Sequence, residues 1–200
     1  MAAKIIIFRH GEGTHNTGEF YSSDPEHPNY RKAVLTELGK QQVLSSVKQV
    51  AADLEEKNIL AVLSSPLPRA LESAQIAMDY LSVPATLLES DRRLIEARAG
   101  ERESTIYSDY QDEDFWFPEH PESFGGETNE QISSRVISCY RDLIDRYSYK
   151  SSDKSTEQGG VILAFSHGVP IYMLIEAVLG KGRGFKLATA GYISLPVKAI

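Results

Sequence analysis

Cationic and imidazole side chains follow three apolar runs of this 200-residue sequence, residues 5–8, 59–63 and 161–165. Arg9 and His10 follow the first run, Arg69 the second and His167 the third. Two guanidinium groups can hold phosphate oxygens with forked hydrogen bonds, and a neutral imidazole between them can attack phosphorus. These residue types therefore predict a site for phosphoryl transfer.

Such a site needs an unprotonated nucleophile and a proton donor. Nearby arginines disfavour protonation of His10, which keeps its lone pair available near neutral pH. A poor leaving group such as an alkoxide also needs a proton from a positioned acid. Glu96 is a candidate, and chemistry alone leaves Glu101, Glu103 and Asp112 as alternatives. The histidines lack the His-x-x-x-His spacing, so we expect no metal site.

These residues need a scaffold that brings distant segments together. Continuous apolar runs are typical of strands covered on both faces, and stretches of helical spacing separate them. We expect strands near residues 5–8, 59–63, 85–88, 161–165 and 192–197, and helices near 36–56, 68–80, 129–147 and 169–179. This alternation predicts an α/β fold, a three-layer α/β/α sandwich with a mostly parallel central sheet. Ligands bind beyond the carboxyl ends of such strands, so the segments should meet there.

Length and composition predict a single domain over residues 1–200, with 42% apolar and 24% charged side chains. The net charge of -7 disfavours nucleic acid and anionic membranes as partners. No apolar run is long enough for a membrane span. The lone Cys139 favours a cytoplasmic setting, and its place on an apolar helical stripe predicts a core residue rather than a nucleophile.

Residues 101–128 are acidic, aromatic and rich in turns, and we expect them to form a loop or cap. Residues 101–130 hold ten acids against one base, Arg102, whereas the rest of the chain holds 18 acids and 20 bases. We predict that this segment repels highly anionic substrates and favours neutral, apolar or basic leaving groups. The aromatic stretch 107–124 is either a cap over the core or a partner-binding loop.

Four separated motifs resemble the histidine phosphatase superfamily, in the branch that includes cofactor-dependent phosphoglycerate mutases and related phosphatases. The motifs are Arg9-His10-Gly11-Glu12, the Ser-Pro-Leu-Pro-Arg-Ala-Leu-Glu-Ser-Ala block at 65–74, the Leu-Ile-Glu-Ala-Arg-Ala-Gly acid motif at 94–100, and Ser166-His167-Gly168. Glu127, with Arg135 eight residues further on, resembles another landmark of the family.

The resemblance implies a role for each site residue. His10 would be the phosphorylated nucleophile, and Glu96 would be the general acid and then the base that activates water. The phosphate contacts would come from Arg9, Arg69, His167 and Asn16. The implied enzyme is a metal-independent phosphatase without a cofactor, acting on a small phosphorylated substrate or a phosphorylated side chain.

Two alternatives stay open, a phosphoglycerate mutase-type phosphotransfer and a catalytically idle phospho-ligand or protein-binding module. Mutases of this branch carry Arg directly after the acid and Tyr three positions beyond it, where this chain has Ala97 and Ala99. His15 stands where the mutase signature has Trp. These departures favour a phosphatase, and the retained site residues disfavour an idle module. The sequence fixes neither the substrate nor the oligomeric state.

Overall fold

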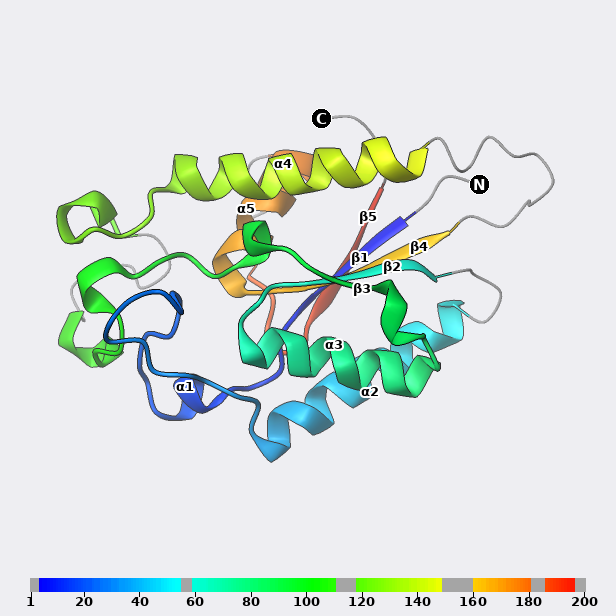
Figure 1. The fold of residues 1–200 in the computed structure, drawn as a ribbon, viewed down its shortest axis with the longest axis horizontal. Helices are drawn as coiled ribbons and strands as arrows, with labels where there is room; N and C mark the ends of the chain where they lie inside the picture. The colour runs from blue at the N-terminus through cyan, green and yellow to red at the C-terminus, as the bar shows by residue number, and fades with distance from the viewer. Residues whose placement is uncertain (1–3, 55–58, 111–117, 149–159, 181–185, 197–200) are drawn as a thin grey trace.

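A computed structural model describes residues 4–54, 59–110, 118–148, 160–180 and 186–196, whose centre is a five-stranded sheet (Figure 1). The strands are β1 (Lys4–Arg9), β2 (Ile59–Ser64), β3 (Leu88–Ser90), β4 (Val161–Ser166) and β5 (Tyr192–Pro196). Their order is β3-β2-β4-β1-β5, and every neighbouring pair is parallel except β1 with β5. The predicted α/β fold with a mostly parallel sheet is confirmed.

Helices cover both faces of this sheet. The α-helices of the described ranges are α1 (Thr14–Thr17), at the end of the sheet, and α2 (Glu37–Leu54), α3 (Pro68–Leu81), α4 (Asn129–Ser148) and α5 (Gly168–Leu179). Figure 1 shows α2 and α3 on one face and α4 and α5 on the other. Thr36 caps α2, because its Oγ1 accepts the Gly39 N–H at 3.0 Å. Within the described ranges, no helix is both long and apolar enough to cross a membrane.

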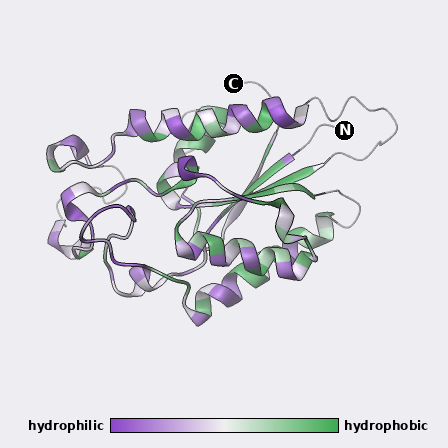
Figure 2. Ribbon diagram, in the orientation of Figure 1, coloured by the Kyte–Doolittle hydropathy of each residue, from purple (hydrophilic) through white to green (hydrophobic). Residues whose placement is uncertain are grey.

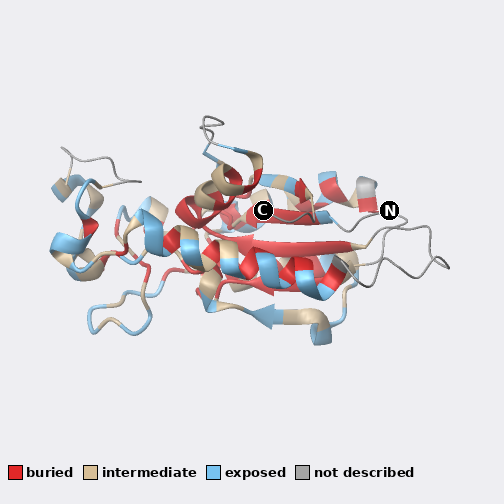
Figure 3. Cartoon of the chain, turned by 90° about the horizontal axis from the view of Figure 1, so that it is seen from above, coloured by how far each residue is buried: buried red, intermediate tan, exposed pale blue. Residues whose placement is uncertain are grey.

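The two faces of the sheet hold separate apolar clusters. In β1, Ile5 and Ile7 pack into the cluster with α4 and α5, whereas Ile6 and Phe8 pack into the cluster with α2 and α3. The three central strands, β1, β2 and β4, are accordingly apolar and mostly buried (Figures 2 and 3). Cys139 is a buried member of the first cluster, and burial raises the pKa of its thiol to about 12.

One predicted strand was placed too early in the sequence. Residues expected to form the third strand begin with a 3-10 turn, Ala85–Leu87, and the strand itself is Leu88–Ser90. This edge strand pairs with β2 and has two exposed residues, so no apolar run marks it in the sequence. The segment 11–35 also contains the short helix α1, which the pattern did not predict.

The other elements that we identify are 3-10 turns near the candidate site. They lie at Arg92–Leu94, Gly100–Arg102, Tyr107–Tyr110 and Pro121–Phe124. Three of these fall in or at the edge of the segment that we expected to be irregular, and residues 111–117 lie outside the described ranges. The segments 11–35 and 95–110 gather at one end of the sheet (Figure 1).

That end of the sheet is where three parallel strands finish. The register places Arg9 of β1 beside Ser166 of β4, and Ser64 of β2 beside Phe165. Beyond the strands, the His10 N–H donates to the Ser166 carbonyl at 3.0 Å. The sheet therefore brings together the three segments that carry the predicted site residues.

Candidate active site

His10 lies directly beyond β1 and is 1% exposed. Its Nδ1 lies 2.6 Å from the Gly11 carbonyl oxygen, and Arg69 Nε donates to its Nε2 at 3.2 Å. Because a carbonyl oxygen only accepts, Nδ1 carries the proton and the lone pair is on Nε2. Burial, reinforced by Arg69, His15 and Arg9, holds the pKa of His10 well below its ordinary value. The imidazole is therefore neutral.

Arg69 and Arg9 bring two guanidinium groups to this imidazole. Arg69, in the first turn of α3, is 1% exposed, and its buried Nη1 has no hydrogen-bond partner among the described residues. Arg9 donates through Nη1 to the Leu187 carbonyl at 2.7 Å. Burial lowers the pKa of both guanidinium groups, and the nearby charge of Glu96 opposes this effect. An anion in this space would offset their loss of hydration.

His167 lies against His10 from the end of β4. Its ring centroid is 5.0 Å from that of His10, and its side chain is fully buried. Nε2 shares a 2.7 Å hydrogen bond with Ser65 Oγ, whereas Nδ1 has no partner in the described part of the chain. Burial and the Arg69 charge hold the pKa of His167 well below its usual range.

Glu96 lies at the pocket that opens above these groups, and its carboxylate accepts the Ala97 N–H at 2.9 Å. The sequence alternatives are placed differently. Glu103 is 1% exposed and accepts both the N–H and the hydroxyl of Ser23, at 2.9 and 2.5 Å. Glu101 is exposed and does not line the pocket, and Asp112 lies outside the described residues.

Arg135 of α4 holds the segment that carries Glu96. Its guanidinium donates to the carbonyl oxygens of Arg93 and Ile95, both at 2.7 Å, and of Glu96 at 3.2 Å. The same group forms a 2.7 Å ion pair with the buried carboxylate of Glu127. The Glu127–Arg135 motif therefore fixes the backbone beside the candidate acid.

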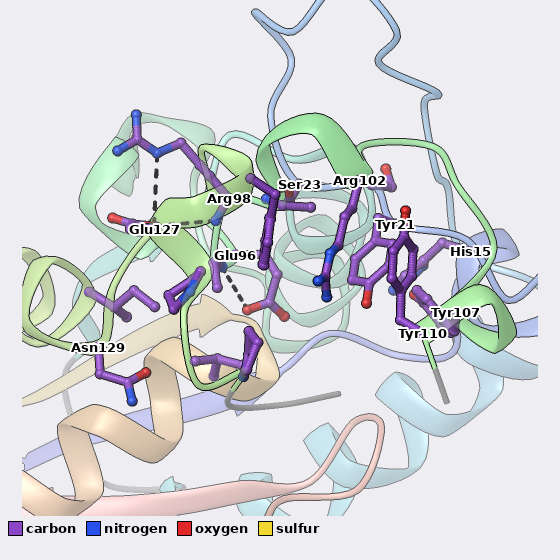
Figure 4. A pocket seen from close by; sticks show the side chains of 18 of the residues that line it. His15, Tyr21, Ser23, Glu96, Arg98, Arg102, Tyr107, Tyr110, Glu127 and Asn129 are labelled. Atoms are coloured by element: carbon purple, nitrogen blue, oxygen red, sulfur yellow. Dashed lines mark hydrogen bonds and ion pairs between the residues drawn. The ribbon is translucent and has the colours of Figure 1, made fainter. Parts of the chain in front are cut away.

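The pocket has a polar floor and a largely aromatic wall (Figure 4). Arg9, Arg69, His15, Asn16 and Glu96 are among its lining residues. In Figure 4, His15 and three tyrosines lie together on one side and Glu96 toward the other, with Arg102 between them. The aromatic residues that line the pocket are Tyr21, Tyr107, Tyr110 and Phe124.

The described part of the acidic segment contributes little free negative charge to this pocket. Its described lining residues include one acid, Glu127, which is paired with Arg135. Arg102 lies over the rings of Tyr110 and Phe124, at 4.1 and 3.6 Å from their centroids. The described part of the segment therefore presents aromatic rings and a cation, not a repelling carboxylate cluster.

The six predicted site residues thus come together at one end of the sheet. Asn16 lines the pocket, and its Oδ1 accepts the Gly13 N–H at 2.9 Å. The sequence did not predict that Ser65 bonds to His167 or that the tyrosines line the pocket, because these contacts depend on loop conformation. No group of three or more His, Cys, Asp or Glu side chains suited to a metal ion occurs in the described ranges.

Solved structures with this fold include enzymes of phosphate ester chemistry. A mycobacterial glucosyl-3-phosphoglycerate phosphatase superposes with a TM-score of 0.72 at 18% identity, covering 96% of this chain and 88% of its own. A phosphoglycerate mutase from Bacillus anthracis superposes with a TM-score of 0.70 at 20% identity, and the match covers 96% of this chain and 86% of the mutase. The YhfR protein of Bacillus stearothermophilus superposes with a TM-score of 0.72 at 20% identity, and the match covers 96% of this chain and 90% of YhfR.

A search of curated proteins found no match. A family model does match, however, and it spans residues 5–195, which include all six predicted site residues and all but the first residue of β1 and the last residue of β5 in the sheet. The model describes the histidine phosphatase superfamily, branch 1, and this chain belongs to that family.

Proposed function

We propose that this chain is a metal-independent phosphatase that hydrolyses phosphomonoesters through a phosphohistidine on His10. One observation carries the proposal. The unprotonated Nε2 of His10 lies against the buried Arg69, whose Nη1 has no partner among the described residues, and His167 Nδ1 is equally unpartnered. A phosphoryl group at Nε2 would supply oxygens to both.

In the first step, the Nε2 lone pair of His10 forms a bond to phosphorus as the bond from phosphorus to the ester oxygen breaks. Glu96, in its protonated form, gives its proton to that oxygen, and the alcohol leaves. The four residues that would hold the other phosphoryl oxygens are Arg9, Arg69, His167 and Asn16.

In the second step, the Glu96 carboxylate takes a proton from a water molecule as the water oxygen bonds to phosphorus. The bond from phosphorus to Nε2 breaks, inorganic phosphate leaves, and His10 recovers its lone pair. Glu96 ends protonated and ready for the next substrate. Nδ1 keeps its proton throughout, because the Gly11 carbonyl accepts it.

The pocket favours hydrolysis over the mutase reaction. Ala97 and Ala99 both line it, at the positions where the mutases that the sequence resembles carry Arg and Tyr. The substrate class is a small phosphoester or a phosphorylated side chain, and the buried lone Cys139 fits a cytoplasmic setting.

A phosphate-release screen tests the proposal. It would cover sugar phosphates, nucleotides, phosphoglycerates and phosphoamino acids, with His10→Ala as the test and the exposed His120→Ala as the matched control. We expect turnover in the wild type, a loss of about 1,000-fold or more in His10→Ala, and no change in His120→Ala. Substantial turnover in His10→Ala would remove His10 as the nucleophile.

Product analysis separates the alternatives. A mutase would return the phosphoryl group to a second substrate molecule faster than to water. An idle binding module would give neither phosphate nor a phosphoenzyme with any substrate in the screen.

A further inference from the structure

A third imidazole lies at the candidate site. His15, on α1, is 6% exposed, and its ring centroid is 5.3 Å from that of His10, with the rings inclined at 56°. It lines the pocket together with Arg9 and Arg69. The ring of His167, which follows β4, lies 5.0 Å from that of His10. His10 therefore has two imidazole neighbours, one on α1 and one at the end of β4.

The backbone around His15 fits closely to the ring. A Cβ atom on Gly13 would lie 2.7 Å from His15 Nδ1, so a larger residue at that position would displace the imidazole. The Gly13 N–H is bound by Asn16, and Phe20 packs edge-on to the ring at 6.5 Å. These contacts fix the ring but satisfy neither of its nitrogens.

The hydrogen-bonding capacity of this buried imidazole is unused. Nδ1 is buried without a partner, and no described residue forms a hydrogen bond with either ring nitrogen. Buried polar nitrogens without partners are rare and call for an explanation. Packing alone would be served as well by a phenyl ring, so the unpartnered Nδ1 points to a ligand.

The charge state of His15 suits a phosphate oxygen. Burial, with Arg69 and Arg9 nearby, lowers its pKa to about 2, so the ring is neutral and carries one N–H. The two arginines are donors only and cannot accept that proton. A phosphoryl oxygen held between these arginines is an acceptor, and the N–H can bind it without adding positive charge to the site.

We propose that His15 is a phosphate-contacting residue, whose imidazole N–H donates to an oxygen of the phosphoryl group that His10 receives. This role rests on the proposed function. It adds a second donor on α1, beside Asn16, to those on the three segments that follow the strands.

Two substitutions of equal length test the role of the N–H. His15→Gln keeps an N–H donor, whereas His15→Met removes it, and exposed His120→Met is the control. The measurement is the equilibrium binding of orthovanadate, an analogue of the transferring phosphoryl group, by calorimetry. We expect His15→Met to bind about 10- to 100-fold more weakly, with His15→Gln within several-fold of wild type.

A purely structural role predicts a different result, because both substitutions would then weaken binding equally. Equal affinities in the two variants, or wild-type affinity in His15→Met, would overturn the proposal. If the variants do not fold, the ring of His15 in the wild type is followed by nuclear magnetic resonance. Vanadate should then shift its nitrogen signals, and unchanged signals count against the contact.

Failure of this proposal is distinguishable from failure of the proposed function. Vanadate binding that depends on the donor, without turnover of any phosphoester, would leave the His15 contact standing and remove the phosphatase. If turnover is lost in His10→Ala but vanadate binds His15→Gln and His15→Met equally, the phosphatase stands and the His15 contact is removed.

Discussion

At the scale of single residues, the two side chains that we propose as nucleophile and acid lie in different environments. His10 is buried and held neutral, with its lone pair on Nε2. Glu96 is half-buried and lines the pocket. Groups whose surroundings differ in this way can act as nucleophile and as acid at one pH.

The role proposed for Glu96 predicts a dependence on the leaving group. Glu96→Gln cannot donate a proton, so transfer from an alkyl phosphate should slow by about 100-fold or more. p-Nitrophenyl phosphate needs little protonation of its leaving group, so its first step should survive. Rapid-mixing measurements would then show a burst of nitrophenol followed by slow turnover, because the base for the second step is missing.

The matched control is Glu101→Gln, which alters an exposed acid outside the pocket lining. It should leave both substrates unaffected. If Glu96→Gln slows the first step equally for alkyl and aryl esters, the carboxyl group is not the proton donor.

Residue types alone predicted part of this arrangement. The arginines account for some of the low pKa of His10, but burial is the larger cause, and the depth of a side chain is not readable from its neighbours in sequence. The Gly11 carbonyl that fixes the tautomer is likewise a property of loop geometry. Residue chemistry left Glu96 and Glu103 as alternatives, the family resemblance favoured Glu96, and the structure shows the Glu103 carboxylate bound to Ser23.

At the scale of elements, α4 does more than cover the sheet. Arg135 reaches from it to three carbonyl oxygens of the segment 93–96 and to Glu127, whose side chain is 4% exposed. The long apolar periodicity of α4 was readable in the sequence. The hydrogen bonds from Arg135 to the irregular segment could not be predicted from the sequence, because every residue has a backbone carbonyl.

The contacts of Arg135 predict a large effect on the free energy of unfolding. Arg135→Met leaves Glu127 buried without its closest cation, which should lower the free energy of unfolding by about 3–5 kcal/mol. Adding Glu127→Gln removes the buried charge, so the double variant should recover part of the loss. Urea unfolding measures all three proteins.

An exposed ion pair on the same helix provides the comparison. Arg146 pairs with Glu89 at 2.8 Å, with both side chains 46% exposed. Arg146→Met should therefore cost no more than about 1 kcal/mol. A similar cost for the two arginines would contradict the role given to burial at Arg135.

At the scale of the whole molecule, the net charge of -7 is a poor guide to the pocket. The acids of residues 101–130 suggested a repelling cap, yet within the described ranges that segment lines the pocket with aromatic rings, Arg102 and a paired Glu127. Composition counts charges but does not say which way they face. That residues 1–200 form one catalytic domain stays a prediction.

The three buried imidazoles of the site predict how the stability of the molecule depends on pH. The pKa values of His10, His15 and His167 all lie below the ordinary value of 6.5. Below pH 6.5, the unfolded chain takes up protons that the folded chain excludes, so the free energy of unfolding should fall with falling pH. Above that pH these groups are neutral in both states, and their contribution is constant.

His15 allows one share of this effect to be isolated. Its folded pKa of about 2 implies a loss of about 1.4 kcal/mol per pH unit, or about 2 kcal/mol between pH 6.5 and about pH 5. His15→Met should therefore show a shallower decline over this range in urea unfolding, whatever its stability at pH 7. The control His120→Met should keep the wild-type slope, because it changes an exposed side chain outside the site. If His15→Met instead follows the wild-type slope, His15 is protonated in the folded protein, and the neutral donor assigned to it at the phosphate site is lost with it.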